Sequence, residues 1–134
     1  MLDINIDHIG YAVSDIDRSL KLFLKLGYEK LSDLVIDEIR DVKVVFIKHG
    51  NLKIELISPI SEKSPINGYL KKNGNTLYHI CYLVSDINDT IEKLKNLKFR
   101  LIEKPNSAIA FESRRISFLY HIDYGLLELV EQTR

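Results

Sequence analysis

The sequence of 134 residues contains no tryptophan, three prolines, one methionine and one cysteine. Because Cys81 has no second cysteine to pair with, an internal disulfide is excluded, which indicates a reducing, cytoplasmic environment. No stretch approaches the roughly 20 consecutive apolar residues of a membrane-spanning helix, so we expect no membrane partner. The first residues include Asp3 and Asp7, where a signal peptide has basic residues and a long apolar run, so we expect no secretion signal.

The sequence also lacks an excess of either charge, because 19 lysines and arginines balance 19 aspartates and glutamates. Nucleic-acid-binding domains usually carry a basic excess or a basic stripe, so nucleic acid is not an expected partner. Hydrophobic residues make up 46% of the chain, which is an ordinary share for a globular protein. The length suits one compact domain, or two half-sized modules that share a core.

What the sequence does contain is an internal repeat. The segments 7–16 (DHIGYAVSDI) and 78–87 (YHICYLVSDI) share seven of ten residues, and their histidines lie 79 − 8 = 71 positions apart. Such self-similarity indicates a duplicated module. We therefore predict a single domain over 1–134, built of two modules at about 1–60 and 76–134 and a short helical connector at 61–75.

Both modules show the same order of patterns: an alternating strand, a helix begun by Ser-Asp, and then three more strands. In the first module we expect strands at 4–13, 28–35, 42–47 and 52–57, and a helix that ends before Gly27. In the second module we expect strands at 77–84, 99–103, 115–120 and 126–131, and a helix that ends near Asn96. This repeated β-α-β-β-β order predicts an α+β fold with an eight-stranded, mostly antiparallel sheet whose helices cover one face.

Alternation along the last strand of each module places one glutamate on the face away from the helices. Glu55 and Glu128 each stand between two aliphatic residues that point to the core, so each carboxylate points the other way. The two glutamates lie 128 − 55 = 73 positions apart, which is the histidine offset plus two residues of loop. The sequence thus predicts that His8, Glu55, His79 and Glu128 share the face opposite the helices.

Two neutral imidazoles and two carboxylates from duplicated halves match the nitrogen and oxygen ligands of a divalent metal site. Four protein ligands leave one or two open positions, which suits a catalytic ion that also takes substrate oxygens. The donor set fits Zn²⁺, Ni²⁺, Co²⁺, Mn²⁺ or Fe²⁺ and does not choose among them. The alternative is a solvent-exposed face with structural histidines, which Lys53 beside Glu55 would suit. The recurrence of both residue types at matching places favours the metal site.

At these residues the sequence resembles the vicinal oxygen chelate superfamily, in its glyoxalase I-like (lactoylglutathione lyase-like) and methylmalonyl-CoA epimerase-like branch. The resemblance spans essentially the whole chain and is carried by 7–9 (DHI), 50–59 (GNLKIELISP), 64–66 (SPI), 72–74 (KNG), 78–80 (YHI) and 125–129 (GLLEL). It implies that the two modules wrap into a U-shaped sheet around one divalent ion, and that the protein is a homodimer. The ligand positions of the family fall on His8, Glu55, His79 and Glu128.

The resemblance also implies a metal-dependent lyase or isomerase that moves a proton at a carbon next to a chelated carbonyl, through an enediolate. The substrate would be an acyl-CoA thioester, as for an epimerase, or a glutathione hemithioacetal, as for a lactoylglutathione lyase. Glu128 is the first candidate for the catalytic base and Glu55 is the second. Arg114 and Arg115 are candidates to bind an anionic handle of the substrate, with surface solvation as the alternative.

Phe46 and Phe118 stand in equivalent strands, 118 − 46 = 72 positions apart, and are candidates to line the substrate cleft, although core packing also explains them. The chain differs from the epimerases of the family in three places, one of which is 120–123 (YHID), where those epimerases have His-Pro-Lys. The loop before the seventh strand reads AIAFESRR over 108–115, where those epimerases have Gly-Ala-His-Gly. No acid stands near Val44, where they carry a second catalytic carboxylate.

Two other activities remain open from the sequence. A resistance-type protein of the same fold would bind a small molecule without catalysis, but such proteins usually lack the full set of four ligands. Extradiol ring cleavage would use Fe²⁺ with two histidines and one glutamate, and the additional carboxylate of Glu55 would crowd the position that oxygen needs.

Overall fold

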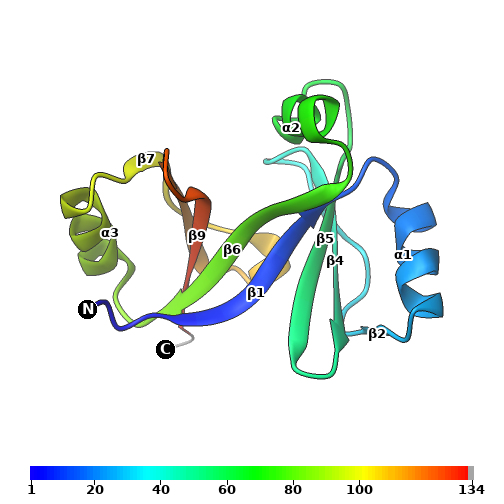
Figure 1. Ribbon diagram of the computed structural model, residues 1–134, viewed down its shortest axis with the longest axis horizontal. Helices are drawn as coiled ribbons and strands as arrows, with labels where there is room; N and C mark the ends of the chain where they lie inside the picture. Colours follow the sequence, from blue (N-terminus) through cyan, green and yellow to red (C-terminus); the bar gives the residue numbers. More distant parts are fainter. Residues whose placement is uncertain (133–134) are drawn as a thin grey trace. The chain divides into compact units, whose positions relative to one another are not determined.

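A computed structural model describes residues 1–132, and within them the fold is a mostly antiparallel, nine-stranded sheet with three α-helices (Figure 1). This confirms the α+β prediction. The helices are α1 (Ile16–Lys25), α2 (Ile66–Asn73) and α3 (Ile87–Asn96), with a short 3₁₀ turn, η1 (Ile109–Phe111). The strands are β1 (Asn5–Ala12), β2 (Glu29–Lys30), β3 (Val35–Asp37), β4 (Val42–His49), β5 (Leu52–Pro59), β6 (Thr76–Val84), β7 (Arg100–Ser107), β8 (Arg115–His121) and β9 (Gly125–Glu131). None of the described helices combines the length and apolar character that a membrane span needs.

The segment before β4 forms two short strands where the sequence predicts one. β2 pairs with the end of β4 and β3 pairs with its start. Between them the hydroxyl of Ser32 accepts a hydrogen bond from the backbone N–H of Phe46 at 2.9 Å, where a continuous strand would supply a carbonyl. The predicted strand over 28–35, and with it the count of eight strands, is therefore wrong. β7 is also longer than the predicted 99–103, because its ladder with β8 continues through register shifts to Ser107.

The chain divides into two compact units, and the division falls within β1 and β6. We call His8–Tyr78 the first half, and Met1–Asp7 together with His79 onward the second half. The sequence repeat groups residues 1–7 with the first module. In the structure, however, Leu2 and Ile4 pack against the apolar core of the second half. The extreme N-terminus therefore contributes to the core of the half that follows it by more than 70 residues in the sequence.

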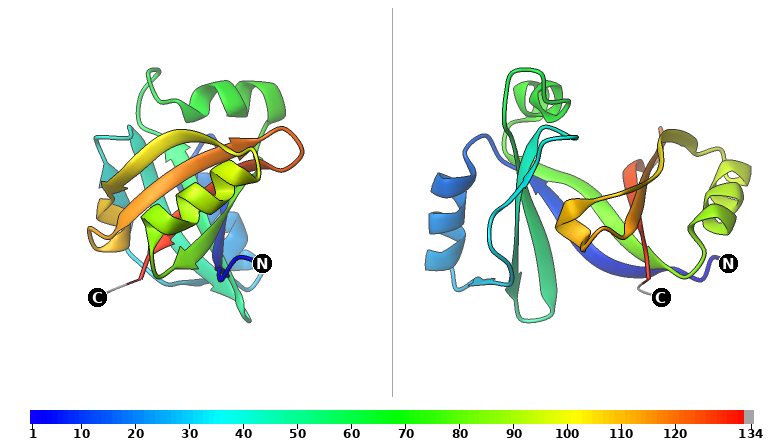
Figure 2. Two further views of the ribbon diagram at one scale, coloured as in Figure 1. Left: turned by 90° about the vertical axis from the view of Figure 1, so that its left-hand side faces the viewer. Right: turned by 180° about the vertical axis from the view of Figure 1, so that it is seen from behind.

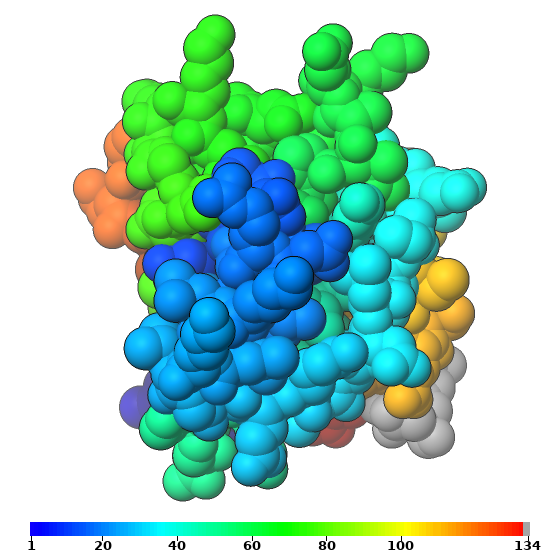
Figure 3. All heavy atoms as spheres, turned by 90° about the vertical axis from the view of Figure 1, so that its right-hand side faces the viewer, coloured from blue at the N-terminus to red at the C-terminus, as the bar shows by residue number. Residues whose placement is uncertain are grey.

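In the first half, β5 pairs in parallel with β1 and antiparallel with β4, and β2 and β3 lie on the outer side of β4. Side chains that alternate along these strands meet α1 in a core, which consists of Val13, Ile16, Val45, Ile47, Ile54 and Leu56. Because successive residues of a strand point to opposite faces, Phe46 and Glu55, which are paired across β4 and β5, point away from α1. In the space-filling view, α1 and the chain that follows it (blue to cyan) form one surface of this half (Figure 3).

The second half repeats this arrangement. β9 pairs in parallel with β6 and antiparallel with β8, which in turn pairs with β7. Figure 2 shows α3 lying along one face of these strands. The core under the helix consists of Val84, Ile87, Ile91, Leu94, Leu119, Leu127 and Leu129. Phe118 and Glu128, paired across β8 and β9, occupy the places of Phe46 and Glu55 and point away from α3. We call the face opposite α1 or α3 the His face of each half.

Candidate metal centre

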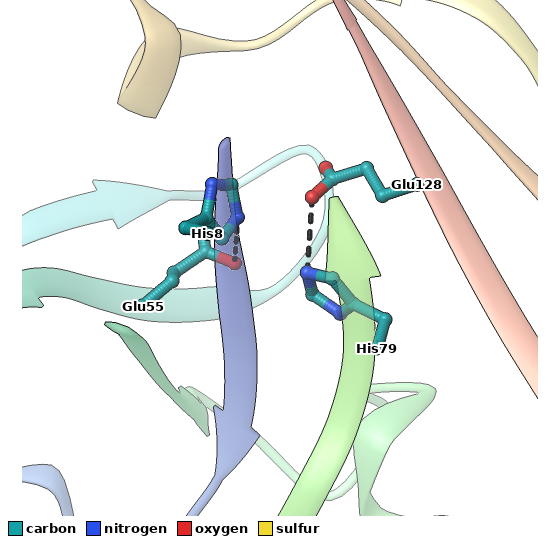
Figure 4. Close-up of side chains that lie close together, drawn as sticks. All are labelled: His8, Glu55, His79 and Glu128. Atoms are coloured by element: carbon teal, nitrogen blue, oxygen red, sulfur yellow. Dashed lines mark ion pairs between the residues drawn. The ribbon is translucent and has the colours of Figure 1, made fainter. Parts of the chain in front are cut away.

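The His face of the first half carries a buried imidazole–carboxylate pair. β1 places His8 and the neighbouring strand β5 places Glu55, and both side chains are almost wholly buried. The Nε2 atom of His8 lies 3.7 Å from Oε1 of Glu55. The ring of Phe46 stands edge-on to the imidazole, with 5.3 Å between ring centroids. This aromatic contact holds the ring of His8 in one orientation, with Nε2 facing the carboxylate (Figure 4).

The second half contains the same pair on the equivalent strands. His79 of β6 and Glu128 of β9 are each 1% exposed, and Nε2 of His79 lies 2.9 Å from Oε1 of Glu128 (Figure 4). Phe118 stands edge-on to His79 at 5.4 Å, and the interplanar angle of 82° equals that between Phe46 and His8. The sequence repeat is therefore a structural repeat, down to the orientation of the rings.

The geometry of each pair fits two donors of one metal ion. Imidazole nitrogens and carboxylate oxygens bind ions such as Zn²⁺ at about 2.0–2.2 Å, so two donors of one ion lie at most about 4.4 Å apart. The separations of 3.7 and 2.9 Å both satisfy this limit. Removing a carboxylate from water is costly unless hydrogen bonds or a cation compensate for its charge. A cation would compensate for the burial of Glu55 and Glu128.

The two phenylalanines lie where the sequence places them, on strands β4 and β8. Both are on the His face, and each contacts the histidine of its own half. Phe46 also carries the ammonium group of Lys53 over its ring, 4.9 Å from the centroid. The aromatic side chains therefore contact the imidazoles and hold them in place. This role differs from both roles expected from the sequence, which were core packing and lining of the substrate cleft.

The two arginines before and at the start of β8 hold protein groups. Arg115 forms a two-point ion pair with Glu131, with separations of 2.7 and 2.9 Å. The hydrogen bonds that Arg115 donates to the carboxylate of Glu131 raise the pKa of Arg115, against a smaller opposing effect of desolvation. By alternation with Leu119, Arg115 points to the face that α3 covers. Arg114 donates from Nε to the carbonyl of Phe111 at 3.1 Å and from Nη1 to the carbonyl of Glu131 at 3.5 Å.

The remaining histidines and the cysteine lie apart from these pairs. His49 stacks against Tyr28 at 5.1 Å at the exposed end of β4, and Nδ1 of His121 accepts the backbone N–H of Asp123 at 3.0 Å. Cys81 is fully buried on the His face, opposite Glu128 in the register of β6 and β9. None of the three belongs to a group of side chains able to hold a metal within the described residues.

Asp37 is a buried carboxylate that the sequence did not single out. Asp37, the last residue of β3, is 4% exposed and forms an ion pair with Arg40. The predicted strand ended at Val35, so no face could be assigned to residue 37. The sequence did contain a signal for a short edge strand, which is the alternation of Val35, Ile36 and Asp37. In such a strand the acid must point to one of the two faces of the sheet.

Comparison with known proteins places this geometry in a family. The sequence profile of the Glyoxalase/Bleomycin resistance protein/Dioxygenase superfamily matches residues 7–118. The mitochondrial methylmalonyl-CoA epimerase of Bos taurus is 34% identical over 128 residues, which cover 92% of this chain and 72% of that protein. The ethylmalonyl-CoA/methylmalonyl-CoA epimerase of Cereibacter sphaeroides is 31% identical over 129 residues, which cover 95% of this chain and 96% of that protein.

A solved structure agrees. The crystal structure of methylmalonyl-CoA epimerase from Mycobacterium tuberculosis superimposes with a TM-score of 0.81 at 26% identity, covering 96% of this chain and 88% of that one. The superfamily resemblance inferred from the repeated histidines and glutamates is thereby confirmed. The chain belongs to the Glyoxalase/Bleomycin resistance protein/Dioxygenase superfamily, and its homologues include methylmalonyl-CoA epimerases.

Proposed function

We propose that the protein is an acyl-CoA epimerase whose two histidine–glutamate pairs together hold one divalent cation. The ligands would be His8, Glu55, His79 and Glu128, which form a set of side chains able to hold a metal ion. The observation that carries the proposal is the duplication of a buried pair with matched ring contacts, one in each half. The epimerase relatives, which share about a third of their residues with this chain, supply the reaction class.

When bound, the cation would act as a Lewis acid on the thioester carbonyl, which lowers the pKa of the neighbouring C–H and stabilises the enediolate. The protein must then move the proton. We assign this role first to Glu128, with Glu55 as the second candidate, because both carboxylates lie on a His face, where the cation would hold the substrate. The carbon inverts when the proton is removed from one side of the planar enediolate by the base and a proton is delivered to the other side by a second acid, which is the other carboxylate or water.

The substrate would be a coenzyme A thioester with an acidic hydrogen next to the carbonyl. Phe46 and Phe118 would exclude water from the His face, which protects the enediolate from competing protonation. Arg114 is a better candidate than Arg115 to bind an anionic part of the substrate, since Arg115 is paired with Glu131 on the helix-covered face. A homodimer and a cytoplasmic location stay predictions.

The proposal is tested by hydrogen exchange at the substrate α-carbon in D₂O. We expect metal-loaded protein to exchange the α-proton of methylmalonyl-CoA, and to act far more slowly, if at all, on the methylglyoxal–glutathione adduct. Glu128→Gln should lower the exchange rate by about 10²–10⁴-fold, the usual contribution of a positioned general base. The matched control is Glu131→Gln, a carboxylate three residues along the same strand that points to the helix-covered face; its exchange rate should stay within about threefold of wild type.

Other outcomes of this experiment are equally clear. Exchange with the glutathione adduct and none with methylmalonyl-CoA would replace the epimerase by a lactoylglutathione lyase. Exchange with neither substrate, in protein shown to hold a metal, would contradict both enzymes and leave the superfamily assignment unchanged. Equal rates for Glu128→Gln and wild type would remove Glu128 as the base, and the same experiment on Glu55→Gln would then decide the second candidate.

A further inference from the structure

A buried ion pair on the His face of the first half is not used by the chemistry described above. It joins Asp37, at the end of β3, to Arg40, in the turn that leads to β4. Asp37 is 4% exposed, and the side chain of Arg40 is 14% exposed. The pair therefore lies almost entirely out of water.

The register of β3 and β4 fixes the face on which the pair lies. Asp37 stands directly opposite Val42, in a ladder where Val35 stands opposite Val44. Residues directly opposite each other in an antiparallel pair point to the same side. Val42 and Val44 alternate with Val45, which lies in the core under α1, so they point to the His face with Phe46. The carboxylate of Asp37 therefore points to the face that carries His8 and Glu55.

Asp37 holds Arg40 by two hydrogen bonds. Its Oδ1 accepts the backbone N–H of Arg40 at 3.0 Å, and its Oδ2 accepts a hydrogen from Nη1 at 3.1 Å. The first bond fixes the turn, and the second fixes the guanidinium. The turn itself is tied to the chain after β5, because the backbone N–H of Ile60 donates to the carbonyl of Asp41 at 3.0 Å. The guanidinium is therefore held on the His face before any substrate binds. The turn that carries it is in the cyan part of the chain in Figure 3.

Stability alone is a weak reason for such a pair. Desolvating two charges costs about as much as their attraction returns, and apolar side chains of similar volume often serve as well. The neighbouring positions on this face are apolar: Val35, Val42, Val44 and Ile57. The other partly buried arginine–carboxylate pair in the described chain, Arg115 with Glu131, lies instead on the helix-covered face of the second half. Of these two arginine–carboxylate pairs, that of Asp37 and Arg40 is the more buried and lies on a His face.

We propose that Arg40 is a substrate-binding residue that recognises an anionic oxygen group of the acyl-CoA, and that Asp37 is its positioning residue. A guanidinium offers five N–H donors in a planar fork that matches carboxylate and phosphate oxygens. This proposal rests on the proposed acyl-CoA substrate. The epimerases that this sequence resembles carry a second catalytic carboxylate near Val44, where this chain has no acid. Arg40 would give the first half a polar group, but this group would recognise the substrate and would not act as a base.

The spacing along β4 favours the phosphate end of coenzyme A over a carboxylate on the acyl group. The row of Val42 and Asp37 lies four residues from the row of Phe46 and Glu55. At about 3.4 Å per residue this is about 14 Å along the strand. A carboxylate on the reacting carbon stays near the thioester oxygen, whereas the phosphates are separated from it by the whole pantetheine arm.

The test compares Arg40→Gln with wild type on two thioesters, methylmalonyl-CoA and the methylmalonyl thioester of pantetheine, which lacks phosphate. We expect KM for the CoA thioester to rise about tenfold or more, with kcat retained, because Arg40→Gln removes a charge-assisted contact made before the chemical step. KM for the pantetheine thioester should not change. If KM rises for both thioesters, the anion is the acyl carboxylate and Arg40 still binds it. If KM rises for neither, the proposal is overturned.

Two further variants separate recognition from stability. Asp37→Asn keeps the shape and should raise KM less than Arg40→Gln, since the guanidinium remains but is no longer held. Glu131→Gln breaks the comparable pair on the helix-covered face and should lower the melting temperature without changing KM; a matching rise in KM would show a merely structural effect. Titration of free CoA by calorimetry tests Arg40 without turnover. An unchanged affinity in Arg40→Gln would overturn recognition of the phosphate end of CoA by Arg40, whereas absent turnover in wild type would contradict only the proposed function.

Discussion

At the scale of single residues, what the sequence could predict depended on alternation. An acid between two core aliphatic residues of a strand has only one other face to occupy, and this placed Glu55 and Glu128 correctly with respect to α1 and α3. Alternation could not predict what else a long side chain would meet. Arg115 is paired with Glu131, the last residue of β9, and that partner can be identified only once β8 and β9 are in register.

Tyr124 gives a residue-level prediction about pH. Partial burial raises its pKa above the ordinary value for tyrosine, and the hydrogen bond between its hydroxyl and that of Tyr82, at 2.8 Å, raises it further. The folded state therefore keeps the phenol proton at a pH where the unfolded chain loses it. The stability from this group is complete below pH about 10, the ordinary tyrosine pKa, and is lost as the pH rises through the higher value of the folded state.

We expect a spectrophotometric titration of the folded protein to show one of its seven tyrosines ionising after the ordinary range. Tyr124→Phe should remove that late step. In the urea-unfolded protein, the control, all tyrosines should titrate together near pH 10. A late step that persists in Tyr124→Phe would show that another tyrosine is responsible.

At the scale of elements, the duplication extends to both ends of the paired helices. Asp15 and Asp86 cap α1 and α3, and each side chain accepts a backbone N–H three residues later. Both helices end in the same pair of backbone N–H to carbonyl hydrogen bonds. In both, the first residue beyond the C-cap takes the left-handed conformation. In α1 this residue is Gly27, with φ of 101°, and in α3 it is Lys98, with φ of 74°. The sequence predicted the glycine stop of α1 but had no signal for a lysine in that role.

Lys98→Gly should stabilise the protein by about 1 kcal/mol, because a non-glycine residue in the left-handed region costs about 1–2 kcal/mol and a flexible unfolded chain offsets part of the gain. The measurement is the midpoint of urea unfolding, compared between variants with the same m-value. Lys98→Ala is the matched control: it removes the side chain and keeps the backbone cost, so its midpoint should not rise. Loss of stability in Lys98→Gly would mean that the lysine side chain contributes more than the strained backbone costs.

Edge strands were the elements that the sequence predicted least well. β2 and β3 together contain five residues, too few for a period of two to be distinct. The break between them is made by the hydroxyl of Ser32, a contact with β4 that depends on tertiary structure. By contrast β4 and β5 are eight residues each, are rich in aliphatic residues and join at a tight turn, and the sequence located both.

At the scale of the whole molecule, a gene-level duplication and a structural division do not coincide. The repeat begins at Asp7, and the first seven residues nevertheless belong by their contacts to the second half. Leu2 and Ile4 complete the core under α3, whereas Ile6 is exposed. Periodicity within the segment 1–7 cannot reveal this, because it identifies the apolar side chains and not the core that receives them. The sequence could therefore predict the modules but not how the segment before the repeat packs.

The proposed function depends on one condition, that the two buried pairs share a single cation. Each pair alone supplies two ligands, and two ligands bind a divalent ion weakly, whereas four bind it tightly. A site made by both halves therefore predicts that loss of either histidine has the same effect as loss of both.

The most direct measurement is the metal content of purified protein by mass spectrometry, for wild type, His8→Ala, His79→Ala and the double variant, after loading with Mn²⁺, Co²⁺, Ni²⁺ or Zn²⁺ and removal of free ion. The account predicts one ion per chain in wild type and nearly none in each variant. His121→Ala, a histidine outside the pairs, should keep the full ion. Two ions per chain in wild type, or one ion retained in both single variants, would contradict a shared site.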